Sequence, residues 1–200
     1  MLYDGKLRDL PFVSACLTAV CAVLFLIPYM TGYLQIYEAG VLDASAVLHR
    51  GEYGRILWSL FLHGDLQHLF NNLLILFFLG SMLEKEAGHV RFAAVCLLSG
   101  IGGNLLSLAL KIYTMDPAVS LGASGMVFGL NGMLLALILY SEKSLPWATP
   151  RRVVLMIALS LYNGFTGVNV DNGAHVGGLI TGFVITSILC HLNRSGGRAA

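Results

Sequence analysis

The sequence predicts an all-α membrane protein, a bundle of six transmembrane helices in a single domain that covers residues 1–200. Hydrophobic residues make up 56% of the chain and charged residues only 12%, whereas soluble domains carry about 25% charged residues. The mean hydropathy is +0.76, and several apolar runs approach the roughly 20 residues that a helix needs to cross a bilayer. The formal net charge of +1 and the absence of a basic run give no sign of nucleic-acid binding.

Six apolar segments are candidate membrane spans. They lie at about residues 11–33, 66–83, 92–112, 121–140, 152–167 and 174–192. The first is longer than the apolar part of a signal peptide and is expected to be a retained anchor. The segment at about 34–65 is too polar to span, yet it contains the apolar run from Ile56 to Leu62. We expect this loop to lie partly embedded at the membrane interface, with Trp58 at headgroup depth.

The distribution of Lys and Arg predicts the orientation, because cytoplasmic loops carry an excess of these residues. With six spans, the two termini and the second and fourth loops share one side, which holds nine of the 12 Lys and Arg residues. Both termini are therefore expected to be cytoplasmic. This orientation places His68, Ser124 and His175 near the starts of three spans that are entered from outside, at a similar depth.

A glycine-flanked serine and a histidine open the fourth and sixth spans. Ser124 would have free backbone N–H groups beside it at a helix N-terminus. The alternative is a serine that only packs against a neighbouring helix. An ionisable residue such as His175 is costly within a span and usually functional, although an imidazole bonded to a backbone carbonyl is the structural alternative.

Small residues recur every four positions along both of these spans. Ala174, Gly178 and Gly182 form one such face, and Gly125 and Gly129 form another. Faces of this kind let two helix backbones approach closely. Close approach would bring the serine side chain within hydrogen-bond reach of the imidazole, as a nucleophile and base require.

The second span begins with polar residues at helical spacing. His68 and Asn72 are one turn apart and share a face. Both side chains can donate to an oxygen that becomes negative, as acyl transfer requires. The alternative is an interfacial polar cluster that caps the helix. His63 is interpreted as a residue that orders the loop.

Neither a metal nor a cofactor is expected. His63 and His68 are five residues apart and would point about 140° away from each other on a helix. The sequence has no His-Glu-x-x-His motif, and no carboxylate lies deep in a span to complete a zinc site or to serve an aspartyl protease. The four cysteines lie in apolar segments without metal or disulfide spacing and are interpreted as packing residues.

These residues together resemble the rhomboid family of intramembrane serine proteases, over most of the chain. The Gly-x-Ser-Gly signature is present at Gly122–Gly125 and the Ala-His-x-x-Gly signature at Ala174–Gly178. The third signature, His-x-x-x-x-His-x-x-x-Asn, is present at His63, His68 and Asn72. The six spans, the long first external loop and the cytoplasmic termini fit the same family. Three signatures in this order are far more specific than any one alone.

The resemblance implies a reaction and a role for each residue. The chain would be a serine endopeptidase that hydrolyses peptide bonds in or near the transmembrane helices of other membrane proteins. Ser124 would be the nucleophile and His175 its general base, a dyad without a third carboxylate. The oxyanion would be bound by the Ser124 backbone N–H and the side chains of His68 and Asn72, with Gly122 giving room beside them.

Further positions correspond to supporting residues of the family. Arg55 with Glu52 would stabilise the first loop, and Glu84 matches a structural acid on the cytoplasmic side. Position 128, one turn after the serine, is usually tyrosine in the family and is Phe128 here. Phenylalanine keeps a ring that can pack on the imidazole, but it lacks the hydroxyl of tyrosine. Gly54 stands where a tryptophan often precedes the loop arginine.

The implied partners are the lipid bilayer and transmembrane protein substrates, which must unwind locally to expose their carbonyls. By resemblance, a substrate would arrive beside the second and fifth spans, with the loop at 165–173 as a lid. The expected location is a bacterial inner membrane, with the site opening to the extracytoplasmic side. Two alternatives are a pseudoprotease, against which intact Ser124 and His175 argue, and a small transporter, which would predict an internal repeat that the two halves do not show.

Overall fold

The computed structural model describes residues 10–141, 148–166 and 170–196, without the side chains of 163 and 194–196. Across these ranges the regular secondary structure is helical, apart from one isolated bridge between Leu42 and Ser120, and turns and irregular segments connect the helices. The elements are α2 (Phe12–Thr31), α3 (Gln35–Gly40), α4 (Ala44–Arg50), α5 (Arg55–Trp58), η1 (Ser59–Phe61), α6 (Leu66–Ala87), α7 (His89–Thr114), α8 (Ser124–Tyr140), α9 (Pro150–Thr166) and α10 (Asn172–Gly196).

A long helix lies at each of the six predicted positions. Four of them, α2, α6, α7 and α10, are long and apolar enough to cross a membrane. Helix α8 is apolar but has only 17 residues, and α9 has the same length and carries two arginines in its first turn. The helical class is confirmed, whereas the count of six crossings stays a prediction.

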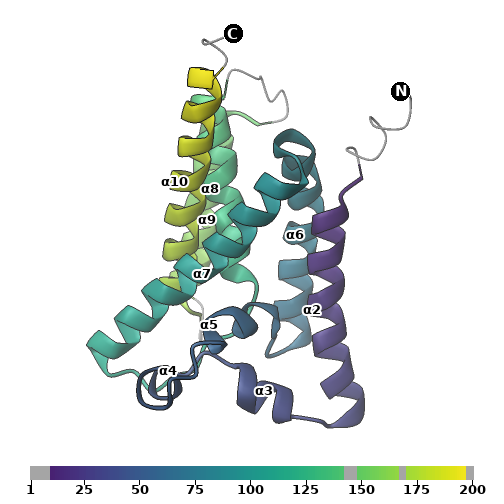
Figure 1. Ribbon diagram of the computed structural model, residues 1–200, viewed down its shortest axis with the longest axis vertical. Coiled ribbons are helices and arrows are strands. Elements are labelled where there is room, and N and C mark those ends of the chain that lie inside the picture. Colours follow the sequence, from purple (N-terminus) through teal and green to yellow (C-terminus); the bar gives the residue numbers. More distant parts are fainter. Residues whose placement is uncertain (1–9, 142–147, 167–169, 197–200) are drawn as a thin grey trace.

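The long helices form a bundle around α7 and α8 (Figure 1). Helices α8 and α10 make the most extensive contact, α7 packs across both of them, and α2 lies against α6. The short helices α3 to α5 gather at the end of the bundle where α2 ends and α6 begins (Figure 1). Helix α2 begins and α10 ends at the opposite end. Which end faces the cytoplasm stays a prediction.

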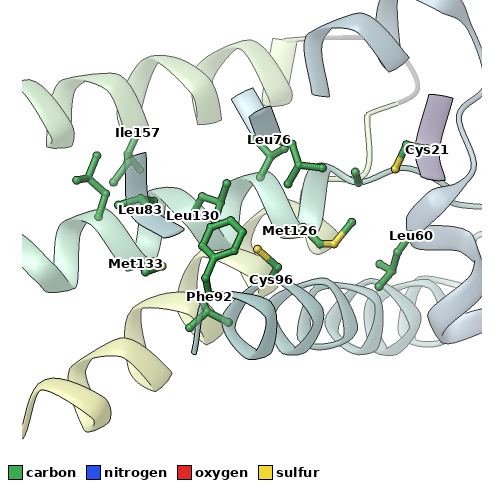
Figure 2. Close-up of a cluster of buried hydrophobic side chains, with 14 of the residues drawn as sticks. Cys21, Leu60, Leu76, Leu83, Phe92, Cys96, Met126, Leu130, Met133 and Ile157 are labelled. Atoms are coloured by element: carbon green, nitrogen blue, oxygen red, sulfur yellow. The ribbon is translucent and has the colours of Figure 1, made fainter. Parts of the chain in front are cut away.

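The apolar core runs along the middle of the bundle, where side chains of α6, α7, α8 and α9 meet (Figure 2). Leu76 and Leu83 of α6 contribute to it, with Phe92 of α7 and Leu130 of α8 beside them, and all four are fully buried. The outward faces also carry large apolar side chains, such as Phe78, which is 63% exposed. Such outward faces are expected of helices that lie in lipid.

The first loop is built from short helices whose apolar residues divide between two environments. Leu60 and Leu62 are fully buried in the protein, whereas Leu57 and Trp58 are exposed. The protein itself therefore covers part of the apolar run that we expected at the membrane interface. The exposed Trp58 remains placed for contact with headgroups.

Glu84 joins three helices at the end of the bundle away from the loop. Its buried carboxylate accepts hydrogen bonds from the backbone N–H groups of Val13 (2.7 Å) and Ser14 (2.8 Å) and from the Ser14 hydroxyl (2.7 Å). The His89 Nδ1 lies 2.6 Å from the same carboxylate. Because free N–H groups at a helix start need acceptors, Glu84 fixes the starts of α2 and α7 against the end of α6.

Candidate active site

Ser124 is the first residue of α8, as predicted. The turn before it passes through Gly122 with φ of +129°, a backbone conformation that favours glycine. The Gly122 N–H donates to the Ser59 carbonyl (2.8 Å), and the Ala123 N–H donates to Nε2 of His63 (3.4 Å). The buried His63 therefore orders the segment before Ser124, in agreement with its interpretation as a structural residue.

His68 and Asn72 of α6 both lie against Gly122. A Cβ at position 122 would be 2.6 Å from His68 Cε1, 2.8 Å from His68 Nε2 and 3.8 Å from Asn72 Nδ2. Only glycine leaves room for this approach. The Asp65 carboxylate caps α6 by accepting from the His68 N–H (2.7 Å), which fixes the position of His68 in the first turn.

The Asn72 Nδ2 is buried and has no hydrogen-bond partner among the described residues. Leaving a buried donor unsatisfied costs about 1–3 kcal/mol, so such groups call for an explanation. An acceptor that arrives with a substrate beside Gly122 would supply the missing partner. The arrangement fits a site for an oxygen that becomes negative.

His175 lies in the first turn of α10, and its ring stacks on Phe128 with centroids 4.2 Å apart and planes 15° apart. Phe128 is one helical turn after Ser124, so the two residues share a face of α8. The imidazole is thus held over the face of α8 on which Ser124 lies. A Cβ on Gly164 of α9 would be 3.1 Å from His175 Nδ1, so α9 closes the site from a third side.

The glycine faces of α8 and α10 meet as predicted. A Cβ on Gly178 would overlap the carbonyl oxygen of Gly125, and a Cβ on Gly182 would overlap that of Gly129. Helix axes can approach this closely only where side chains are absent. The prediction of close packing between these helices is confirmed, and it brings the start of α8 beside the start of α10.

Arg55 and Glu52 form the ion pair that the resemblance implies, with Nε and Oε2 2.5 Å apart. Arg50 also bonds Glu52 (2.7 Å), and hydrogen bonds from Arg50 and Arg55 hold the pKa of Glu52 below its usual value. Arg55 also donates to the carbonyl of Val41 (2.9 Å). The next residue, Leu42, pairs with Ser120 just before the active-site turn.

Two polar residues near the site were not predicted from the sequence. Asn104 of α7 donates to the Ile56 carbonyl (2.7 Å) and the Ser59 hydroxyl (2.9 Å), which fixes the first loop on the bundle. Asp171 precedes α10 and accepts from the Ala174 N–H (2.9 Å). An aspartate directly before a helix is a readable cap signal. The sequence holds no signal for the partners of Asn104.

The lid that the resemblance implies is described only in part. Residues 167–169, which include Asn169, lie outside the described residues. Before this gap, Phe165 at the end of α9 is exposed. After the gap, Asn172 donates to the Gly164 carbonyl (3.3 Å), which joins the start of α10 to α9.

The fold defines a class of protein: an α-helical membrane bundle that carries Ser124 and His175 in the first turns of α8 and α10, and His68 and Asn72 in the first two turns of α6. The model of the Rhomboid domain matches residues 50–192. The chain belongs to the rhomboid family, and this membership together with the apolar helices makes it an integral membrane protein.

Curated relatives agree with this assignment. RHOMBOID-like protein 4 of Arabidopsis thaliana is 38% identical over 161 residues, which cover 78% of this chain and 39% of that protein. Rhomboid protease GluP of Bacillus subtilis (strain 168) is 34% identical over 145 residues, which cover 72% of this chain and 28% of that protein. Putative rhomboid protease YdcA of the same organism is 29% identical over 191 residues, with 94% and 92% covered. The chain spans less than half the length of the first two.

Proposed function

We propose that the protein is an intramembrane serine endopeptidase that hydrolyses peptide bonds in or near the transmembrane helices of other proteins. The observation that carries the proposal is the placement of the His175 imidazole on Phe128, one turn from Ser124. The unpartnered Asn72 amide beside Gly122 adds to it. The names of the two Bacillus subtilis relatives, Rhomboid protease GluP and Putative rhomboid protease YdcA, support the same reaction.

In the first half of the reaction, the Ser124 hydroxyl attacks the scissile carbonyl carbon and His175 takes its proton. The carbonyl oxygen becomes an oxyanion. When the tetrahedral intermediate collapses, the carbon–nitrogen bond breaks and His175 returns the proton to the leaving amine. The stacked Phe128 ring limits rotation of the imidazole during both transfers, in place of a hydrogen-bonded carboxylate.

The oxyanion would form beside Gly122, next to the His68 ring and the Asn72 amide, with the Ser124 backbone N–H as a third donor. Donors held in position before the reaction need no reorganisation when the charge develops. Asn72 would then gain the partner that its buried amide lacks.

In the second half, His175 takes a proton from water as the water oxygen attacks the acyl carbon. When this second tetrahedral intermediate collapses, the bond between the acyl carbon and the Ser124 oxygen breaks, His175 returns the proton to that oxygen, and the carboxyl product leaves. Water must therefore reach a site within the bilayer. We propose that it arrives from the extracytoplasmic side, at the end of the bundle formed by α3 to α5, and that the membrane is a bacterial inner membrane.

A transmembrane substrate would reach Ser124 between α6 and α9. The backbone of α9 packs against α8 and α10, whereas among the described residues it comes close to the backbone of α6 at few positions. Exposed apolar side chains such as Phe70 on α6 and Tyr162 on α9 suit a surface that a lipid or a substrate helix would occupy. The substrate must unwind near the cut, because a helix hides its carbonyls in internal hydrogen bonds.

A fluorophosphonate probe tests the proposal on the purified protein. We expect the wild type to be labelled and Ser124→Ala and His175→Ala to lose labelling while they keep the wild-type unfolding temperature. Cleavage of a synthetic transmembrane substrate should be lost in the same two variants. A folded wild type that neither reacts with the probe nor cleaves a panel of transmembrane substrates would contradict the proposal.

A further inference from the structure

Asp171 is a half-buried residue directly before α10, in contact with the buried Ser107 and Ser120, and the proposed chemistry does not use it. Its carboxylate accepts hydrogen bonds from the hydroxyl groups of Ser107 and Ser120 and from the Ala174 N–H (2.9 Å). Ser107 belongs to α7, Ser120 to the segment before α8, and Ala174 to α10. One carboxylate therefore joins the three parts of the chain that surround Ser124 and His175.

Asp171 and its partner Ser120 lie at the same distance along the chain from the two residues of the candidate dyad. Asp171 is one helical turn before His175, and the backbone N–H of His175 donates to the Asp171 carbonyl (3.2 Å). Ser120 is four residues before Ser124. A hydrogen bond between Asp171 and Ser120 therefore fixes the two segments that carry the nucleophile and the base, each within one turn of the reacting residue.

The segments that bind Asp171 are held in place by hydrogen bonds and burial of their own. Ser120 is held by its two backbone hydrogen bonds with Leu42 (2.8 and 2.9 Å). Ser107 and Lys111 are buried on α7, and the Lys111 ammonium donates to the Ala118 carbonyl (2.7 Å). Burial raises the pKa of Asp171, but the hydrogen bonds from Ser107, Ser120 and the Ala174 N–H, together with the charge of Lys111, outweigh it and hold the pKa below its usual value. An ionised acceptor forms stronger hydrogen bonds than a neutral one.

We propose that Asp171 is a positioning residue for the Ser124–His175 dyad, acting through the backbone of α10 and the hydroxyls of Ser107 and Ser120. It is not a third catalytic residue, because its carboxylate binds the Ala174 N–H and the two hydroxyls. This inference rests on the proposed function. It adds a residue that sets the geometry of the dyad and that the resemblance to the rhomboid family does not imply.

Two substitutions separate the hydrogen bonds from the charge. Asp171→Ala removes the three hydrogen bonds of the side chain and leaves the backbone carbonyl in place. Asp171→Asn keeps an oxygen for the Ala174 N–H and turns its amino group toward Ser107 and Ser120, whose hydroxyls can rotate to accept. For cleavage of a transmembrane substrate, we expect Asp171→Ala to lower kcat about 10- to 100-fold with KM within about twofold, because a misplacement of about 1 Å costs up to about 100-fold in rate.

Asp171→Asn should restore kcat to within about threefold of the wild type. The double variant Ser107→Ala/Ser120→Ala should reproduce the loss, and it replaces Asp171→Ala if that variant does not fold. Asp116→Ala is the matched control, since Asp116 is exposed and caps only the nearby Ala118 N–H (2.9 Å). An unchanged kcat in Asp171→Ala, or a rise in KM that accounts for the whole loss, overturns the inference.

A second measurement does not depend on activity. In a background without the four native cysteines, a disulfide between cysteines placed at 124 and 175 reports how closely the two segments approach. We expect Asp171→Ala to slow its formation and Asp171→Asn to restore the rate. If the wild type proves inactive and this dependence is still seen, the protease proposal fails and the positioning role stands. Equal rates in all three backgrounds refute the positioning role.

Discussion

At the scale of single residues, Asn72 occupies a position that stability alone does not explain. Its Nδ2 is buried without a partner among the described residues, at a cost of about 1–3 kcal/mol. It lies on the same helix face as His68, and both approach the backbone of Gly122. An oxyanion that forms only during the proposed reaction would be the missing acceptor for the Asn72 amide.

We expect Asn72→Ala to lower kcat about 100-fold with little change in KM, because the donor would act on the oxyanion and not on the bound substrate. Cleavage of a transmembrane substrate in detergent measures both constants. Asn71→Ala is the matched control, since Asn71 is the adjacent residue of the same type and is exposed. A loss that appears in KM with kcat unchanged would show that Asn72 binds substrate and does not stabilise the transition state.

The residue types of the site could be predicted from the sequence, and their mutual arrangement only in part. Ser124 and His175 were placed at helix starts because glycines, polar residues and apolar runs mark those starts. Phe128 was expected to keep its packing on the imidazole, and the stacking is present. The contacts of Asp171 could not be predicted, because they join it to hydroxyls 51 and 64 residues away.

At the scale of elements, the contact between α8 and α10 determines how closely the two segments of the dyad approach. Glycines on both helices leave the backbones in direct contact, so neither helix can move toward the other or accept a larger residue. We expect Gly178→Ala to destabilise the fold by about 1–3 kcal/mol and to lower fluorophosphonate labelling of the protein that remains folded.

Thermal unfolding in detergent, followed by labelling at a fixed folded concentration, measures the two effects separately. Gly64→Ala is the control, because a Cβ at Gly64 has no atom within 4 Å. Wild-type stability and labelling in Gly178→Ala would show that the two helices can separate without affecting the site.

Helix boundaries show which local signals were readable. The fourth span was expected from residue 121, but α8 begins at Ser124 because Gly122 has a positive φ that ends the preceding turn. The second was expected to end near 83, but α6 continues to Ala87. The burial of Leu60 and Leu62 depends on surfaces contributed by distant helices, and no local pattern encodes it.

At the scale of the whole molecule, two buried polar groups act at opposite ends of the bundle. Glu84 fixes the helix starts at one end, and His63 fixes the loop at the other. The His63 backbone carbonyl also accepts a hydrogen bond from the Tyr37 hydroxyl (2.8 Å). His63 therefore links helix α3 of the loop to the turn before Ser124.

The state of His63 makes this end of the molecule sensitive to acid. Burial, and then the neighbouring His68, lower the pKa of His63 to about 4. In the unfolded chain the pKa is about 6.5, so between pH 6.5 and 4 the unfolded state binds more protons. Stability must then fall as the pH decreases through this window. Protonation would also place an N–H opposite the Ala123 N–H, which now donates to Nε2.

We therefore expect the free energy of unfolding in detergent to decrease by up to about 3 kcal/mol between pH 7 and pH 4 through His63 alone. His63→Gln keeps an acceptor for the Ala123 N–H and cannot be protonated, so its unfolding free energy should depend less on pH by that amount. The other histidines are present in both proteins, so comparing the two pH profiles removes their contribution. If the pH profiles of the wild type and His63→Gln are parallel, His63 is protonated in the folded protein over the same pH range as in the unfolded chain. The hydrogen bond from the Ala123 N–H would then have to break well above pH 4.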